Sequence, residues 1–230
     1  MKRATTLSLA FLLGLPAISI ADPGNVVSWF SNSLNELTFT CATAVVKLNL
    51  VDANVARVRL EPSGVAFNTN ASFTVIKNWV LPSITVVDGS TLTITTSGLR
   101  VDVSKMPFHL TFRKPDATVW LTDTNATGFT IAPGSTTNLS ETFGMPGGEQ
   151  FYGLGLVLGK PLSYRGQTRT LYNARSGFSS GAMTDMAVPL MLSSKGYGVF
   201  MDNTFSQTLD FTLSSTTQWR ALVTSGELDY

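Results

Sequence analysis

The amino-acid sequence predicts an all-β protein built as one large antiparallel β-sandwich. Short segments in which apolar and polar residues alternate recur along the chain, and turn-forming residues separate them at close intervals. The sequence also contains no amphipathic helical segment of three turns. Many short strands with frequent turns are typical of sandwiches and barrels.

The individual strands are predicted from the periodicity of each segment. Residues 91–95 are expected to pair with residues 99–103 across a short turn. Gly153 and Gly155 lie in a further strand and are expected to provide unusual dihedral angles or close packing, because their spacing differs from that of a phosphate-binding loop. The same alternation predicts the remaining strands, at residues 46–50, 55–60, 108–113, 118–121, 151–155, 188–192, 197–201 and 219–223.

The N-terminal segment has the three parts of a secretory signal peptide. Two basic residues are followed by an apolar run at residues 7–15 and by small residues that end at Ala21. The apolar run is too short to span a bilayer, for which about 20 residues are needed. We predict that residues 1–21 are removed, that residues 22–230 form one domain, and that the mature protein is secreted or periplasmic without a membrane contact. An uncleaved anchor is the alternative; a lipoprotein is disfavoured because no cysteine stands at the cleavage point.

The charge of the mature chain limits its partners. Without the signal segment the chain carries 14 basic and 15 acidic side chains, and charged residues make up only 13% of the full sequence. No basic stripe is present that could follow a phosphate backbone. Nucleic acid is therefore not an expected partner.

Chemistry that cleaves glycosidic bonds needs two carboxyl groups at a defined separation. The acidic residues of this chain stand in no recognisable catalytic context, so we predict no catalytic residue in it. Instead they are expected to be surface or turn acids, among them Glu141, Glu149, Asp185, Asp202 and Asp210.

Metal and cofactor sites are not expected either. The single histidine, His109, and the single cysteine, Cys41, cannot together build a usual zinc site, and no EF-hand spacing occurs. By alternation His109 shares a solvated strand face with Thr111 and Arg113. Cys41 lies in an apolar stretch and is expected to be a small buried strand residue.

Residues 164–185 form the best candidate for a ligand-binding loop. Loops this long in a compact β-domain are usually functional. Because a sugar has apolar faces and many hydroxyl groups, its binding sites combine aromatic rings with polar groups such as Arg and Asn. The alternative is a structural loop with solvated arginines. The predicted substrate-binding residues are Arg165, Tyr172, Asn173 and Arg175.

Five stretches of the sequence carry a family pattern: residues 101–112, Glu149-Gln150-Phe151-Tyr152-Gly153-Leu154-Gly155, Arg165-Gly166 with Leu171-Tyr172-Asn173, residues 188–203 and, as a final strand, residues 226–230. In this order they resemble the N-terminal domain of family 31 glycoside hydrolases, a family of α-glucosidases, α-xylosidases and 4-α-glucosyltransferases. The resemblance extends from about residue 45 to residue 230. Two positions depart from the family pattern: Leu156 stands where Glu is usual, and Ala174-Arg175 stands where an Asp often reaches into the substrate cleft.

The resemblance implies a galactose mutarotase-like sandwich that packs on a catalytic barrel and lends residues 164–185 to the rim of its cleft. The partner would be an α-linked oligosaccharide, bound through that barrel, and the complete enzyme would retain anomeric configuration. The barrel and its Trp-x-Asp-Met-x-Glu type motif have no match in this sequence; Thr184-Asp185-Met186 shares only two letters with it. The alternatives are a free-standing carbohydrate-binding or protein-interaction module and a truncated product without function.

Overall fold

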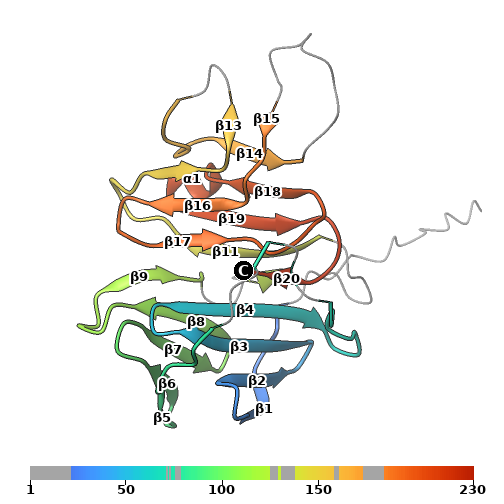
Figure 1. Ribbon diagram of the computed structural model, residues 1–230, viewed down its shortest axis with the longest axis vertical. Coiled ribbons are helices and arrows are strands. Elements are labelled where there is room, and N and C mark those ends of the chain that lie inside the picture. The colour runs from blue at the N-terminus through green and yellow to red at the C-terminus, as the bar shows by residue number, and fades with distance from the viewer. Residues whose placement is uncertain are drawn as a thin grey trace, which may run out of the picture.

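The computed structural model describes residues 22–70, 72, 74–75, 79–124, 129–130, 138–157, 161–172 and 184–230. It confirms the predicted all-β class, because antiparallel strands build every sheet and the only helix among these residues is the single turn α1 (Leu213–Thr216). Figure 1 shows the strands of the first half of the chain below those of the second half. No helix in the described ranges has the length and apolar character required to cross a bilayer.

Two five-stranded sheets form the lower part of the molecule. In the first sheet, the last strand of the chain returns to pair with a strand of the first half (Figure 1). Its order is β1 (Val26–Ser31), β2 (Glu36–Cys41), β3 (Ala44–Asp52), β4 (Val55–Pro62) and β20 (Leu228–Asp229). The second follows sequence order: β5 (Thr85–Val87), β6 (Thr91–Thr95), β7 (Arg100–Lys105), β8 (Phe108–Arg113) and β9 (Val119–Thr122).

Three sheets form the upper part. The largest has the order β10 (Phe129–Thr130), β11 (Leu139–Gly144), β19 (Gln218–Val223), β18 (Gln207–Asp210) and β14 (Thr168–Leu171). The second consists of β12 (Phe151–Gly153), β16 (Leu190–Ser193) and β17 (Gly198–Phe200), and the third of β13 (Leu156–Val157) and β15 (Thr184–Met186).

Alternation along the strands builds the core. In β3, for example, buried and half-buried residues follow one another along most of the strand, as a sheet with one inward face requires. The predicted pairing of residues 91–95 with the segment after residue 99 is confirmed, since Ile94 lies opposite Val101 between β6 and β7. Cys41 is buried at the end of β2, as predicted.

Aromatic rings join the layers. The Phe39 and Phe108 centroids are 5.5 Å apart, and Phe129 of β10 lies 5.9 Å from Phe108. In the upper part, Trp219 stacks on Phe143 with centroids 4.5 Å apart. Aromatic pairs in such orientations stabilise the fold beyond the effect of the apolar area that they bury.

The expectation of a continuous loop at residues 164–185 is wrong, because these residues include β14 and the beginning of β15. Strand β11, which lies between β10 and β19, was also not predicted from the sequence. The reason is the same in β11 and β14: a polar side chain occupies an inward position and breaks the apolar alternation. Glu141 does so in β11 and Arg169 in β14, and both are buried.

Candidate functional site

A tight bend at Gly153-Leu154-Gly155 places the segments that lead to the candidate site. All three residues have positive φ, +92° at Gly153, +60° at Leu154 and +86° at Gly155, so the prediction of unusual dihedral angles is confirmed. The Leu154 N–H donates to the Leu190 carbonyl at 2.9 Å, and the Leu154 side chain is fully buried. The bend therefore turns the chain from β12 into β13, at the end of the molecule where β13 and β15 project (Figure 1).

Gly155→Ala is expected to destabilise this bend. A Cβ at Gly155 would lie 2.0 Å from the Met186 carbonyl oxygen, and φ of +86° is unfavourable for any L side chain. The expected loss is about 1–3 kcal/mol in the free energy of unfolding, measured by urea denaturation. Gly147→Ala is the matched control, because a Cβ there meets open space and its φ is not positive. Equal stability of the two variants would contradict this role of the bend.

Arg165 serves as a clamp between backbone segments. Its guanidinium donates to the carbonyl oxygens of Pro146 and Glu149, both at 3.0 Å, and of Thr216 at 2.6 Å. A planar fork with five N–H groups suits such a junction. Since these carbonyls already accept three of its N–H groups, Arg165 holds the base of the loop in place; its contact with a substrate stays a prediction.

Tyr172 follows β14 and points out of the fold, with 62% of its surface exposed. An exposed aromatic ring is the platform that a sugar face needs. Asn173 and Arg175, the other two predicted binding residues, lie outside the described residues. The structure therefore places Arg165 at the base and Tyr172 at the beginning of the predicted loop.

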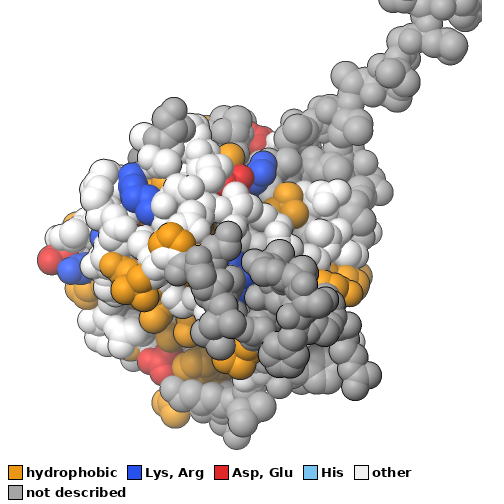
Figure 2. All heavy atoms as spheres, turned by 90° about the horizontal axis from the view of Figure 1, so that it is seen from above, with side chains coloured by type: hydrophobic (Ala, Val, Ile, Leu, Met, Phe, Trp, Pro, Cys, Tyr) orange, Lys and Arg blue, Asp and Glu red, His pale blue; other side chains and the backbone are white. Residues whose placement is uncertain are grey.

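The sheet formed by β12, β16 and β17 carries apolar side chains on its outward face. Leu190 lies opposite Phe200, and Leu192 lies opposite Tyr152, so these four side chains share one face. Leu190 is 38% exposed and Leu192 is 47% exposed. Figure 2, which looks onto the upper end of the molecule, shows several separate apolar side chains at that end. Clustered exposed apolar residues mark interaction surfaces.

Glu149 fixes the hairpin that carries this face. Contrary to expectation it is buried, and its carboxylate accepts hydrogen bonds from the Ser193 hydroxyl at 2.5 Å and the Tyr197 hydroxyl at 2.7 Å. Lys195 Nζ lies 4.0 Å from the same carboxylate. Burial raises the pKa of Tyr197 above its ordinary value, and the charge of Glu149 adds to this. The hairpin β16–β17 is therefore held from its inner side.

A second group of polar residues is sealed inside the core. Glu141 is fully buried, and Asp123 accepts from the Leu110 N–H at 2.8 Å and lies 3.2 Å from His109 Nδ1. Burial raises the pKa of Glu141 well above its ordinary value, and the charge of Asp123 raises it further. The expectation of a surface acid is thus wrong for Glu141, and His109 is half-buried and paired. Neither carboxyl group faces a surface at which a glycosidic bond could be cleaved.

Comparison with protein families identifies this architecture. Residues 45–210 match the glycosyl hydrolase 31 N-terminal galactose mutarotase-like domain. The chain belongs to this family. The resemblance found in the sequence is therefore confirmed, and the large antiparallel sandwich is the fold that a family 31 N-terminal domain has.

Relatives of this family 31 domain are much longer proteins. An isomaltosyltransferase of Sporosarcina globispora is 31% identical over 168 residues, which cover 70% of this chain and 14% of that protein. A family 31 dextranase of Flavobacterium johnsoniae, solved in complex with glucose, has a TM-score of 0.79 at 26% identity, over 90% of this chain and 26% of that one. The cycloalternan-forming enzyme of Listeria monocytogenes, at 18% identity and a TM-score of 0.73, shares the fold and covers 90% of this chain and 20% of its own.

Sequence reasoning missed two parts of the family 31 domain's candidate site. The outward apolar face of β16 could have been found, because Leu190, Leu192 and Phe200 belong to predicted strands whose alternation gives both faces. The clamp made by Arg165 gave no signal, since its partners are backbone carbonyls from three separate segments.

Proposed function

We propose that this chain is the N-terminal accessory domain of an exported glycoside hydrolase that acts on α-glucans. The family match over most of the chain carries this proposal. The names of the dextranase and the isomaltosyltransferase support α-glucans as the substrate class. The chain spans only 14% of one relative and 26% of the other, which fits a domain of a larger enzyme.

In this proposal the domain works through two surfaces. The outward face of β12, β16 and β17 packs against a catalytic domain, because its exposed leucines gain from burial. The segment that begins at Tyr172 then reaches the rim of the substrate cleft. The domain positions substrate and supplies no catalytic carboxyl group.

Export is the second part of the proposal, through a signal peptide at residues 1–21. Asp22 belongs to the fold: its side chain accepts from the Gly24 N–H at 2.8 Å, and its carbonyl accepts from the Thr43 hydroxyl. Cleavage after Ala21 keeps both of these contacts.

The activity of the purified chain tests the proposal. The chain incubated with isomaltose or with nitrophenyl α-glucoside is expected to release no glucose or nitrophenol above the blank, because its core carboxyl groups are inaccessible to substrate. Release that is proportional to protein concentration, and is lost on heat denaturation, would contradict the accessory role.

A free-standing carbohydrate-binding module is the second candidate, favoured by the exposed ring of Tyr172. Titration calorimetry with isomaltooligosaccharides distinguishes the two, because a domain that only borders a cleft is expected to show no saturable heat. Saturable binding that is lost in Tyr172→Ala and kept in Phe205→Ala would support the module. Phe205 is the control, since it is also exposed, at 53%.

A further inference from the structure

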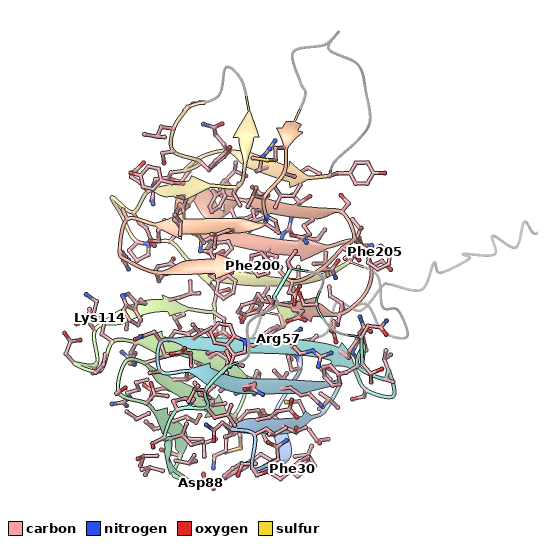
Figure 3. The ribbon with its side chains drawn as sticks, viewed as in Figure 1. Phe30, Arg57, Asp88, Lys114, Phe200 and Phe205 are labelled. Atoms are coloured by element: carbon pink, nitrogen blue, oxygen red, sulfur yellow. The ribbon has the colours of Figure 1, made fainter. Side chains whose placement is uncertain are left out.

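A groove with a volume of about 760 Å³ opens beside Tyr230, where the two parts of the molecule meet. In Figure 1 the C-terminus lies between β4 and β17, and Figure 3 labels Arg57 and Phe200 on opposite sides of this junction. The walls are formed by the beginning of β4 and by β17. Apolar and aromatic side chains make up much of the rest, among them Leu99, Phe112, Trp120, Leu121 and Val199.

The first wall is the edge of β4 beyond the end of β20. Leu228 lies opposite Leu60 and Asp229 opposite Arg59. Tyr230 then exchanges two hydrogen bonds with Val58, at 2.7 and 3.0 Å. β4 begins at Val55, so its first three residues, 55–57, extend beyond Tyr230. Among the described residues, no strand pairs with these three on the β20 side. Since the N–H and C=O groups of alternate residues point to the same side of a strand, those of Ala56 point into the groove.

The second wall is the edge of β17 that lies away from β16, with which no further strand of the described residues pairs. The Met201 N–H donates to the Pro189 carbonyl at 2.8 Å, and the Ser193 N–H donates to the Tyr197 carbonyl at 2.8 Å, so Tyr197 and Met201 face β16. The Asp202 N–H, in contrast, donates to the Asp229 carbonyl at 2.9 Å. By the same alternation, the backbone groups of Phe200 and Gly198 point into the groove.

A groove between two strand edges has the shape of a missing strand. Exposed strand edges accept extended polypeptide, whose backbone provides affinity while alternate side chains fill pockets. We infer that this groove accepts an extended segment joined to the carboxyl end of Tyr230, which prolongs β20 between β4 and β17. The added strand unites the β1–β4 sheet and the β12–β16–β17 sheet.

Charged side chains set the register of this acceptor. Arg57 donates to both carboxylate oxygens of Asp229, through Nε at 2.8 Å and Nη2 at 2.5 Å, and Nη2 lies 3.2 Å from Asp202. Arg59 makes a second pair with Glu227 at 2.7 Å. β20 is therefore anchored immediately before the groove. The Tyr230 ring points inward, since it packs edge-on against Phe143 with ring centroids 5.9 Å apart. The second and fourth residues of a continuing strand therefore also point inward, and the first and third point toward Arg57 and Asp202.

Four-residue extensions of the full chain after Tyr230 test this inference. Thr-Val-Thr-Val places both valines on the inward positions, and it is expected to raise Tm by about 5 °C over the unextended chain. Amide exchange of Ala56 and Phe200 is expected to slow at least about tenfold, because both N–H groups gain a partner. Gly-Ser-Gly-Ser is expected to change neither quantity.

Val-Thr-Val-Thr is the matched control. It has the same composition, but a shift of one residue exchanges the two faces of a strand. This extension is expected to give less than half of the rise in Tm. Equal Tm values for the Thr-Val-Thr-Val and Val-Thr-Val-Thr extensions, or no rise in Tm with either of them, would overturn the inference. A rise that comes with dimerisation in size-exclusion chromatography would also overturn it, because the strand would then pair with a second copy.

Discussion

Trp219→Ala is expected to lower the free energy of unfolding by about 3–5 kcal/mol. The Trp219 side chain is fully buried, with Phe143 at 4.5 Å, Phe211 at 5.6 Å and Phe151 at 6.1 Å between ring centroids. These rings come from β11, β12, β19 and the segment after β18, so the cavity left by alanine lies where the upper strands meet. Urea denaturation measures the effect.

Two controls accompany this variant. Trp219→Phe keeps an aromatic ring in the stack and is expected to lose less than half as much stability. Phe205→Ala removes an aromatic ring that is 53% exposed, and is expected to change the free energy of unfolding by less than about 0.5 kcal/mol. A Trp219→Ala variant as stable as Phe205→Ala would show that the upper core is not packed around this ring.

The second large effect expected is a rise in stability as the pH falls from 8 to 5.5. Burial raises the pKa of Asp123 to about 6, of Asp229 to about 6 and of Glu61 to about 7, so the folded protein binds protons that the unfolded chain does not. The stabilisation that protonation of these groups gives the folded state is fully present below the pKa values of the same groups in the unfolded chain, which are near 4. It is lost as the pH rises through their folded-state pKa values of 6 to 7. The hydrogen bond with Asp123 also raises the pKa of His109, so protonation of His109 likewise adds stability as the pH falls.

The expected gain between pH 8 and 5.5 is roughly 2–4 kcal/mol, followed by urea denaturation at each pH. Glu141→Gln imitates the protonated acid, so it is expected to raise the free energy of unfolding at pH 8 and to raise it by a smaller amount at pH 5.5. Asp210→Asn is the control, because the pKa of Asp210 is lowered and its titration lies below this window. A flat profile from pH 5.5 to 8 in the unmodified chain would contradict the burial of these acids.

The sequence allowed the fold class and about half of the strands to be predicted, because a hairpin with alternating faces is a local pattern. β3, β4, β6, β7 and β8 alternate between faces, and the structure confirms them. β11 was missed because Glu141 occupies an inward position, which only a proton or a polar neighbour makes tolerable in a core. β20 was predicted through the family resemblance alone, since two residues carry no periodicity of their own.

The candidate site was less accessible to sequence reasoning. Composition indicated a polar and aromatic loop, and the structure places Tyr172 at its beginning with an exposed ring. Composition could not indicate that the guanidinium of Arg165 donates to the carbonyls of Pro146, Glu149 and Thr216, because these contacts join residues up to 51 positions apart. A pattern gives the type of a side chain but not the long-range partner that it meets.

The most direct test of the central claim is the size and the first residue of the secreted gene product. An antibody raised against this domain is used to detect that product in culture fluid or periplasm, and the N-terminal sequence is then determined. An accessory domain predicts a polypeptide several times larger than 24.7 kDa that begins at Asp22. A stable product of the size of residues 22–230 alone, or one retained in the cytoplasm with Met1 intact, would contradict it.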